Sequence, residues 1–135
     1  MPTLLRDLAS HDEEIRGTAL GKLFISIYHQ GTVYSASAYA APFLIKLLRS
    51  EATQDKEGLL LLLASLARGD AYHRQHLRMY PEARRQDPAF QRELAEQVVW
   101  VQRTREAVHQ GLDTYQELLS HAEPKIRMNA AYTLA

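Results

Sequence analysis

The chain has 135 residues, no cysteine, and sixteen basic residues that balance sixteen acidic ones. This length suits one domain with a core of its own. Zero net charge argues against a dedicated binder of nucleic acid or anionic membrane, because such proteins usually carry a basic excess. The lack of cysteine excludes disulfides, thiol nucleophiles and cysteine-ligated zinc.

The N-terminal stretch turns acidic too early for a signal peptide. The longest apolar run, from Leu59 to Ala64, is far shorter than the roughly 20 residues that a membrane-spanning helix needs. We therefore expect a soluble, cytoplasmic protein that does not enter a membrane.

The first predicted helix pair covers about residues 3–30. Thr3 can cap a short leucine-containing helix. Asp12 can cap a longer one, with two glutamates in its first turn where the helix dipole favours acid. Apolar residues then follow at helical spacing, at Ile15, Ala19, Leu23 and Ile27. Gly31 ends the run, so the pattern predicts an amphipathic helix with these four residues on its buried side.

The second predicted pair covers about residues 34–69. Its first helix carries four apolar residues: Phe43, Leu44, Leu47 and Leu48. Pro42 either begins this helix or kinks it. The second helix runs from Lys56 to Arg68, with Asp55 or Thr53 as its cap. Five consecutive leucines within this helix place apolar side chains on every side of it, which predicts a helix buried on all sides.

The apolar period is lost between about residues 70 and 87. We expect an irregular insert there, with a short helix after Asp70 that Pro81 breaks. Asp87 and Pro88 then open a long helix over about 88–110, because Asp is a favoured N-cap and Pro a favoured first residue. A third helix pair covers about 112–135. No segment alternates apolar and polar residues over a useful length, so we predict an all-α protein.

Two phrases, EEIRGTALGKL near the start and PKIRMNAAYTLA at the end, share the pattern I-R-x-x-A-x-x-x-L. Ile126 lies 111 positions after Ile15, and both phrases follow a short leucine-containing helix and an acidic or proline-containing turn. The small Ala in the middle lets a neighbouring helix approach. This unit resembles the HEAT repeat of armadillo-type α-solenoids, in which helix pairs stack side by side.

Other stretches are also similar to bacterial HEAT-repeat proteins, namely GTVYSASAYAAPFLIKLL, LLASLARG and AVHQGLDTYQELLSHAEPKIRMNAAYTLA. The resemblance covers most of the chain except roughly residues 70–90. It implies a right-handed α-α superhelix of about three helix pairs, acting as a non-catalytic scaffold that presents a curved helical surface to a protein or peptide. A compact helical bundle is the alternative architecture.

The C-terminal end carries no Gly cap, no basic last turn and no polar closing helix. Solenoids need a capping repeat with a polar outer face. We therefore expect a fragment, or the uncapped N-terminal part of a longer solenoid. Met128, Ala131 and Tyr132 would then be partly exposed, and the last helix could self-associate.

Few residues are candidates for chemistry. His73 and His76 lie three apart beside Asp70, but two imidazoles without a firm third ligand do not define a metal site. Metal-dependent HEAT hydroxylases bind iron through His-Glu dipeptides, which this chain lacks. It also has no G-x-S-x-G motif and no phosphate-binding glycine loop. We predict no enzymatic activity, metal or cofactor; a metal-dependent enzyme is the least favoured alternative.

Two surfaces are candidates for binding a partner. The first lies on the helix after Asp12, opposite its apolar stripe, and comprises Gly17, Gly21, Phe24 and Tyr28. Two glycines inside a helix cost about 1 kcal/mol each relative to Ala, which suggests that something approaches closely. The equivalent places in the last helix are Met128 and Tyr132. Packing against an adjoining repeat is the competing interpretation.

The second candidate is the insert, where arginines outnumber acidic residues and tyrosines lie between them. We select Arg74, Arg78, Arg84 and Arg85. Arg and Tyr anchor protein interfaces, and they also suit phosphate and base contacts. This segment supports the alternative of a nucleic-acid-associated HEAT-like domain. A solvated loop remains the competing interpretation.

Overall fold

The computed structural model describes residues 1–135, which form nine α-helices, one 3₁₀ turn and one two-stranded ribbon. The ribbon contains only four residues, so the prediction of an all-α protein is confirmed. None of the helices combines the length and the apolar character that crossing a bilayer requires.

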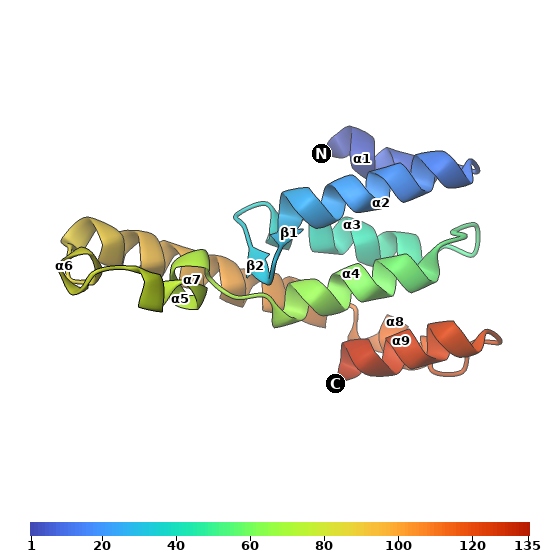
Figure 1. The fold of residues 1–135 in the computed structure, drawn as a ribbon. Coiled ribbons are helices and arrows are strands. Elements are labelled where there is room, and N and C mark those ends of the chain that lie inside the picture. Colours follow the sequence, from blue (N-terminus) through green and yellow to red (C-terminus); the bar gives the residue numbers. More distant parts are fainter.

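Six helices form three antiparallel pairs that lie one beside the next (Figure 1). The pairs are α1 (Pro2–Asp7) with α2 (Glu13–Ile27), α3 (Ser37–Arg49) with α4 (Lys56–Arg68), and α8 (Leu112–Leu118) with α9 (Pro124–Leu134). Helices α2, α4 and α9 lie side by side in what we call the front layer. Helices α1, α3 and α8 lie behind them in the rear layer.

The remaining helices form an arm between the second and third pairs (Figure 1). They are α5 (Tyr72–Gln75), the 3₁₀ turn η1 (Leu77–Met79), α6 (Glu82–Arg85) and α7 (Pro88–His109). The C-terminal part of α7 packs against α3 and α4, whereas its N-terminal part extends away and is accompanied by α5 and α6. The accessible surface is 8195 Å². A compact monomer of this mass would expose about 7,200 Å². The observed surface is larger because the arm protrudes from the rest of the molecule.

Three predicted N-caps are confirmed. Asp12 Oδ1 accepts hydrogen bonds from the backbone N–H groups of Glu14 and Ile15. Asp55 accepts one from Gly58 at 3.0 Å, and Asp87 accepts one from Ala89 at 2.8 Å. Each bond satisfies an amide that the first helical turn leaves without a partner.

Two predicted helix starts need correction. Thr3 does not cap α1, because that helix begins at Pro2, whose fixed φ suits a first position. Pro42 does not begin α3 either; the helix begins at Ser37 and contains Pro42 in its interior. The five residues before Pro42 are therefore already helical.

The ribbon between α2 and α3 was not predicted. Strand β1 (Tyr28–His29) pairs with β2 (Thr32–Val33) across a turn in which Gln30 and Gly31 both have positive φ. Such two-residue turns match the twist of a β-hairpin. The turn also joins the start of the arm, since the Asp70 N–H donates to the Gly31 carbonyl at 2.8 Å. Helix α2 consequently ends at Ile27, and Tyr28 is not part of it, contrary to expectation.

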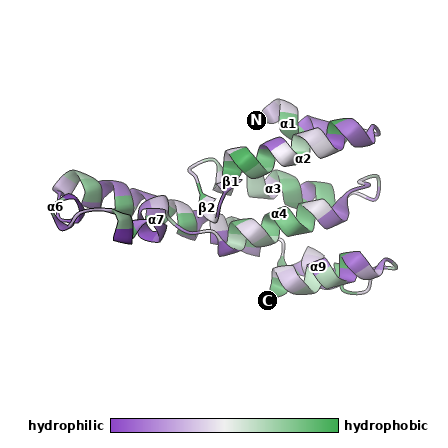
Figure 2. Ribbon diagram, viewed as in Figure 1, coloured by the Kyte–Doolittle hydropathy of each residue, from purple (hydrophilic) through white to green (hydrophobic).

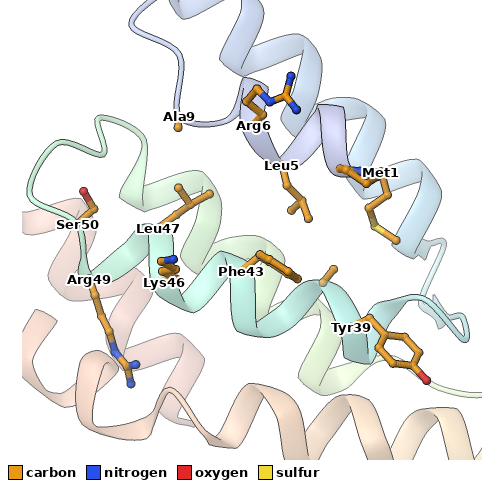
Figure 3. Close-up of a pocket in the computed structure, with 12 residues that line it drawn as sticks. Met1, Leu5, Arg6, Ala9, Tyr39, Phe43, Lys46, Leu47, Arg49 and Ser50 are labelled. Carbon is orange, nitrogen blue, oxygen red and sulfur yellow. The ribbon is translucent and has the colours of Figure 1, made fainter.

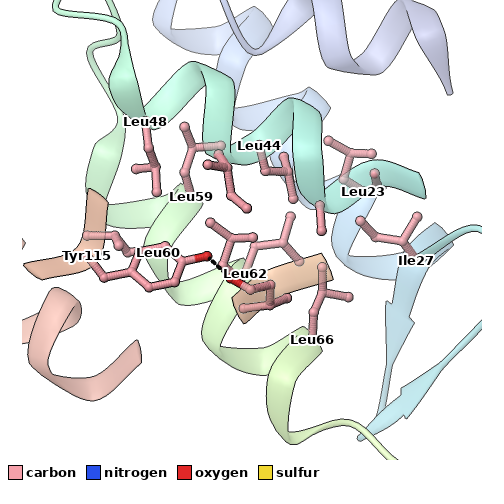
Figure 4. Packing of buried hydrophobic residues seen from close by; sticks show 14 of the residues in the cluster. Leu23, Ile27, Leu44, Leu48, Leu59, Leu60, Leu62, Leu66 and Tyr115 are labelled. Atoms are coloured by element: carbon pink, nitrogen blue, oxygen red, sulfur yellow. Dashed lines mark hydrogen bonds between the residues drawn. The ribbon is translucent and has the colours of Figure 1, made fainter. Parts of the chain in front are cut away.

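Helix α4 is the centre of the core (Figure 4). Four of its five consecutive leucines, Leu59, Leu60, Leu62 and Leu63, are at most 2% exposed. They pack among Leu23 and Ile27 of α2 and Leu44 and Leu48 of α3. Leu61 is 44% exposed, so the prediction that this helix is buried on all sides is wrong: the side that carries Leu61 faces solvent. Figure 2 shows apolar colour on much of α4 and on the C-terminal end of α2, and more polar colour on the arm.

The rear of the core is closed by Tyr115 of α8. Its hydroxyl donates to the Val108 carbonyl at 2.7 Å (Figure 4). Its ring lies over Gly111, where a Cβ would come within 2.6 Å of the Tyr115 ring carbon Cζ. Burial raises the pKa of the Tyr115 phenol. The side chain therefore fastens α8 to the end of α7 in its neutral, hydrogen-bonded form.

The shared phrase of the first and last pairs produces the same contact in both. Arg16 Nη1 donates to the Ser10 carbonyl at 2.9 Å, and Arg127 Nη1 donates to the His121 carbonyl at 2.7 Å, each acceptor lying six positions earlier. In the middle pair, Lys56 Nζ donates to the Ser50 carbonyl, also six positions earlier. Cations near the end of a helix satisfy its unpaired carbonyls. All three turns inside the pairs are held in this way.

The two alanines of the shared phrase are buried as predicted, Ala19 at 1% exposed and Ala130 at 0%. The two isoleucines differ. Ile126 is 6% exposed, but Ile15 is 45% exposed and does not belong to the buried side of α2. Arg16 takes the first buried position instead, with its guanidinium at the turn.

Candidate functional site

The exposed side of the front layer gathers several of the predicted residues. At about 100° per residue, Gly17 and Gly21 lie on the side of α2 that faces away from its buried residues, and the half-buried Phe24 lies at the edge of that side, packed against the core. On α4, Leu61 and Ser65 lie on the side that faces away from the buried residues of that helix. On α9, Met128 and Tyr132 lie on the corresponding side. Leu20 fixes the rotation of α2, since it packs on Gly58 of α4. We call this surface the front face; it comprises Gly17, Gly21, Phe24, Leu61, Ser65, Arg68, Met128 and Tyr132.

Both glycines of the front face are open. A Cβ built at Gly17 or Gly21 would meet no heavy atom within 4 Å. The interpretation that these glycines pack against an adjoining repeat therefore finds no such contact within this chain. The two glycines lie about one turn apart on α2, where another molecule could approach the backbone more closely than side chains would permit.

Aromatic side chains lie at two ends of the front face. Phe24 and Tyr28 meet edge to face with ring centroids 6.4 Å apart, although Tyr28 is in β1. On α9, Met128 is 62% exposed and Tyr132 is 48% exposed, as the sequence predicts. The Arg68 guanidinium lies 3.9 Å from the Tyr132 ring centroid and donates to the Tyr132 carbonyl. This contact holds α4 to α9.

The four predicted arginines of the insert lie on the arm, away from the front face. Arg74, Arg78 and Arg84 are exposed, whereas Arg85 is half-buried and its Nε has no hydrogen-bond partner. Arg74 forms an ion pair with Asp70, and Arg84 lies 4.0 Å from Asp87. Part of the positive charge is thus neutralised locally.

The Asp70 carboxyl shows the balance at this ion pair. Burial raises its pKa. The hydrogen bonds from Arg74 and the Ala71 N–H, together with the charges of Arg74 and Arg105, outweigh that effect and lower the pKa below its usual value. Asp70 is consequently an anion at neutral pH and supports the base of the arm.

His73 binds the short helices of the arm to α7. Its ring stacks on Phe90 with centroids 4.6 Å apart. Nδ1 lies 3.0 Å from the Tyr80 hydroxyl, and Nε2 lies 2.9 Å from Glu93 Oε2. His76 stacks instead on Tyr72. No group of three or more His, Asp or Glu side chains is placed to hold a metal ion.

A groove that the sequence analysis missed lies between α1 and α3 (Figure 3). Its volume is about 810 Å³. Apolar side chains from both helices line it: Met1, Leu5, Ala9, Tyr39, Phe43 and Leu47. Tyr39 is 70% exposed and Phe43 is 56% exposed. The sequence offered one signal, because the apolar residues of α3 cover more of its circumference than a single buried side requires.

Comparisons with protein-family models, with curated proteins and with solved structures find no significant match to this chain. The function is therefore argued from the surfaces described above.

Proposed function

We propose that this chain is a non-catalytic protein-interaction domain built from HEAT-like helix pairs in a right-handed α-solenoid. Two features support this architecture. The first and last pairs share I-R-x-x-A-x-x-x-L, and in all three pairs a basic side chain holds the inner turn through a carbonyl six positions earlier. Side-by-side stacking of such pairs is the principle of α-solenoids.

The front face is the proposed binding surface, and one observation carries this proposal. Two neighbouring helices, α4 and α9, expose large apolar side chains next to the two open glycines of α2, with Leu61, Met128 and Tyr132 each at least 44% exposed. Contiguous exposed apolar surface commonly marks an interaction site, and Tyr and Arg are frequent anchors. The opposite sides of the same helices form the core, so the surface is held rigidly in place.

The test uses the open glycines, because substitution there changes the surface without disturbing the core. The double variant Gly17→Arg/Gly21→Arg should remain folded, and helix propensity should favour it by up to about 1 kcal/mol per site. Its matched control is Gln102→Arg/Gln116→Arg, which adds the same charge at exposed positions of α7 and α8. We would compare the proteins that each form captures from native cell extract.

The proposal expects a protein that wild type and control capture and that the glycine variant loses. Capture of the same proteins by all three forms would exclude the front face. Salt titration separates the nucleic-acid alternative: binding of a 20-nucleotide DNA or RNA through the arm should fall steeply with salt. It should also be lost in Arg78→Glu/Arg84→Glu, whereas front-face binding should not change.

A further inference from the structure

The groove between α1 and α3 is a second, separate surface in the rear layer. Tyr39, Phe43 and Leu47 form one wall from successive turns of α3, and Leu5 faces them from α1 (Figure 3). The lining continues along α3 to Ser50. The eleven steps from Tyr39 to Ser50, at 1.5 Å each, make this wall about 16 Å long, or three helical turns.

The charged residues that line this groove are all basic. Arg6 on α1, Lys46 on α3 and Arg49 at one end are among its lining residues. No acidic side chain is among the lining residues. Neither Arg6 nor Lys46 takes part in an ion pair within the chain. Arg49 is held in place, because its Nε donates to Thr114 Oγ1 at 2.8 Å.

We propose that this groove binds an acidic amphipathic helix of a partner protein. The apolar side of that helix would rest on Leu5, Phe43 and Tyr39. Its carboxylates would face Arg6 and Lys46 from the two walls. A groove with one wall of three turns of α3, a second wall from the shorter α1 and an apolar lining has the form of sites that accept a third helix through anchors at i, i+4 and i+7.

The open form of the groove favours a helix over a small amphiphile. Sites for small ligands usually enclose 70–90% or more of the ligand surface. Here Tyr39 and Phe43 are more than half exposed, so a single acyl chain would keep one side in water. A helix has its own polar side to present to solvent, and only one side of it needs cover.

The charge pattern also favours an acidic helix over a neutral or basic one. Two cations without an ion-pair partner, one on each helix, attract carboxylates and repel a basic peptide, and this discrimination weakens with salt. The charges thus set the class of partner, while the apolar floor supplies most of the burial on binding.

The experiment uses the full chain with any tag at its C-terminus and two fluorescent 18-residue peptides. Both have Leu at helical a and d positions; one carries Glu at the remaining charged positions and the other Lys. Fluorescence anisotropy should show at least tenfold tighter binding of the Glu peptide. Arg6→Glu/Lys46→Glu should reverse this preference. The control Arg103→Glu/Lys125→Glu, with the same net charge but distant positions, should not change it.

Phe43→Ala should weaken binding of the Glu peptide about tenfold. Its side chain is largely exposed, so circular dichroism should show an unchanged fold; Tyr39→Ala provides a second variant for the same wall. Gly17→Arg/Gly21→Arg should bind the peptide as wild type does. This last result separates the groove from the front face, since either proposal can fail while the other holds.

Several results would overturn the proposal. Equal affinity for the two peptides, or equal loss in the control and in Arg6→Glu/Lys46→Glu, would exclude charge recognition in the groove. Binding of dodecanoate with no binding of the Glu peptide would identify a site for a small amphiphile. A dimer in sedimentation velocity that disperses in Phe43→Ala would show that a second copy of this chain occupies the groove.

Discussion

The first and last helix pairs begin from nearly the same phrase and reach different degrees of burial. In both, the arginine of the phrase donates to a turn carbonyl six positions earlier and the alanine is almost fully buried. Beyond these two positions they diverge. Ile126 is buried and Ile15 is 45% exposed, whereas Leu23 is fully buried and Leu134 only half-buried.

The neighbouring helices explain this difference. The start of α2 borders a shallow hollow beside the short helix α1, and Ile15 lies in it with Leu4 and Lys22. Leu23 faces α4, the centre of the core, and Leu134 lies in the last turn of α9. A repeated phrase therefore determines a turn and a small residue at the crossing. How deeply each apolar residue of the phrase is buried depends on the helices that pack beside it.

The largest expected contrast is between the two leucines. Leu23→Ala should destabilise the protein by about 2–5 kcal/mol, because it removes a fully buried side chain and leaves a cavity. Leu134→Ala should cost about 1–2 kcal/mol, since that side chain is only half-buried and its site can be filled by solvent. Urea unfolding measures both. Equal losses would contradict the difference in cover between α2 and α9.

Larger side chains at the two buried alanines test the feature that the first and last pairs share. Ala19→Leu and Ala130→Leu should each destabilise by about 1–3 kcal/mol, because neither site has room for a larger side chain. Ala131→Leu, at an exposed neighbouring position, is the control and should be near neutral. If Ala19→Leu were also neutral, the two pairs would not share a register.

The arginines of the phrase should have a smaller effect. Arg16→Met and Arg127→Met each remove hydrogen bonds to turn carbonyls and should cost about 1–2 kcal/mol. The loss should be greater for Arg127, which also donates to the Ala122 carbonyl, than for Arg16, whose buried Nε has no partner. Arg103→Met is the matched control, with an expected change below about 0.5 kcal/mol. The order of the two losses is read from urea midpoints.

Lys56 of the middle pair should show the smallest effect, and its sign should depend on pH. Desolvation lowers the pKa of Lys56 below 10.5, against the opposing charge of Glu51, so the folded state disfavours the ammonium. The unfolded chain then binds more protons between the lowered pKa and 10.5, and wild-type stability rises with pH in that window. Measured against Lys56→Met, wild type should gain stability from pH 8 to pH 10. A constant difference would contradict this.

Local signals account for the part of the fold that the sequence predicted. Asp12, Asp55 and Asp87 were recognisable as caps because a cap needs only a side-chain oxygen and the next few amides. The ribbon was missed because each strand has two residues, too few to alternate. Its turn also uses Gln30 and Gly31 rather than the Asn-Gly pair that signals a hairpin.

The candidate surfaces were predictable to a lesser degree. Gly17 and Gly21 stood out because glycine is unfavourable inside a helix, whatever surrounds it. Leu61 and Phe43 were assigned to the core, since a pattern of apolar residues gives the sides of a helix but not the number of its neighbours. The groove was invisible for the same reason: Leu5 and Phe43 come from different pairs, and only stacking brings them together.

The position of the arm between the second and third pairs has a consequence for folding order. Helices α4 and α9 lie side by side, yet residues 69–123 separate them in the chain. The connection between α2 and α3 is much shorter. Closing a longer loop costs more chain entropy and slows the contact. We expect α1 to α4 to assemble first, α7 to dock on α3, and α9 to arrive last, so that amides of α4 gain protection from hydrogen exchange before those of α9.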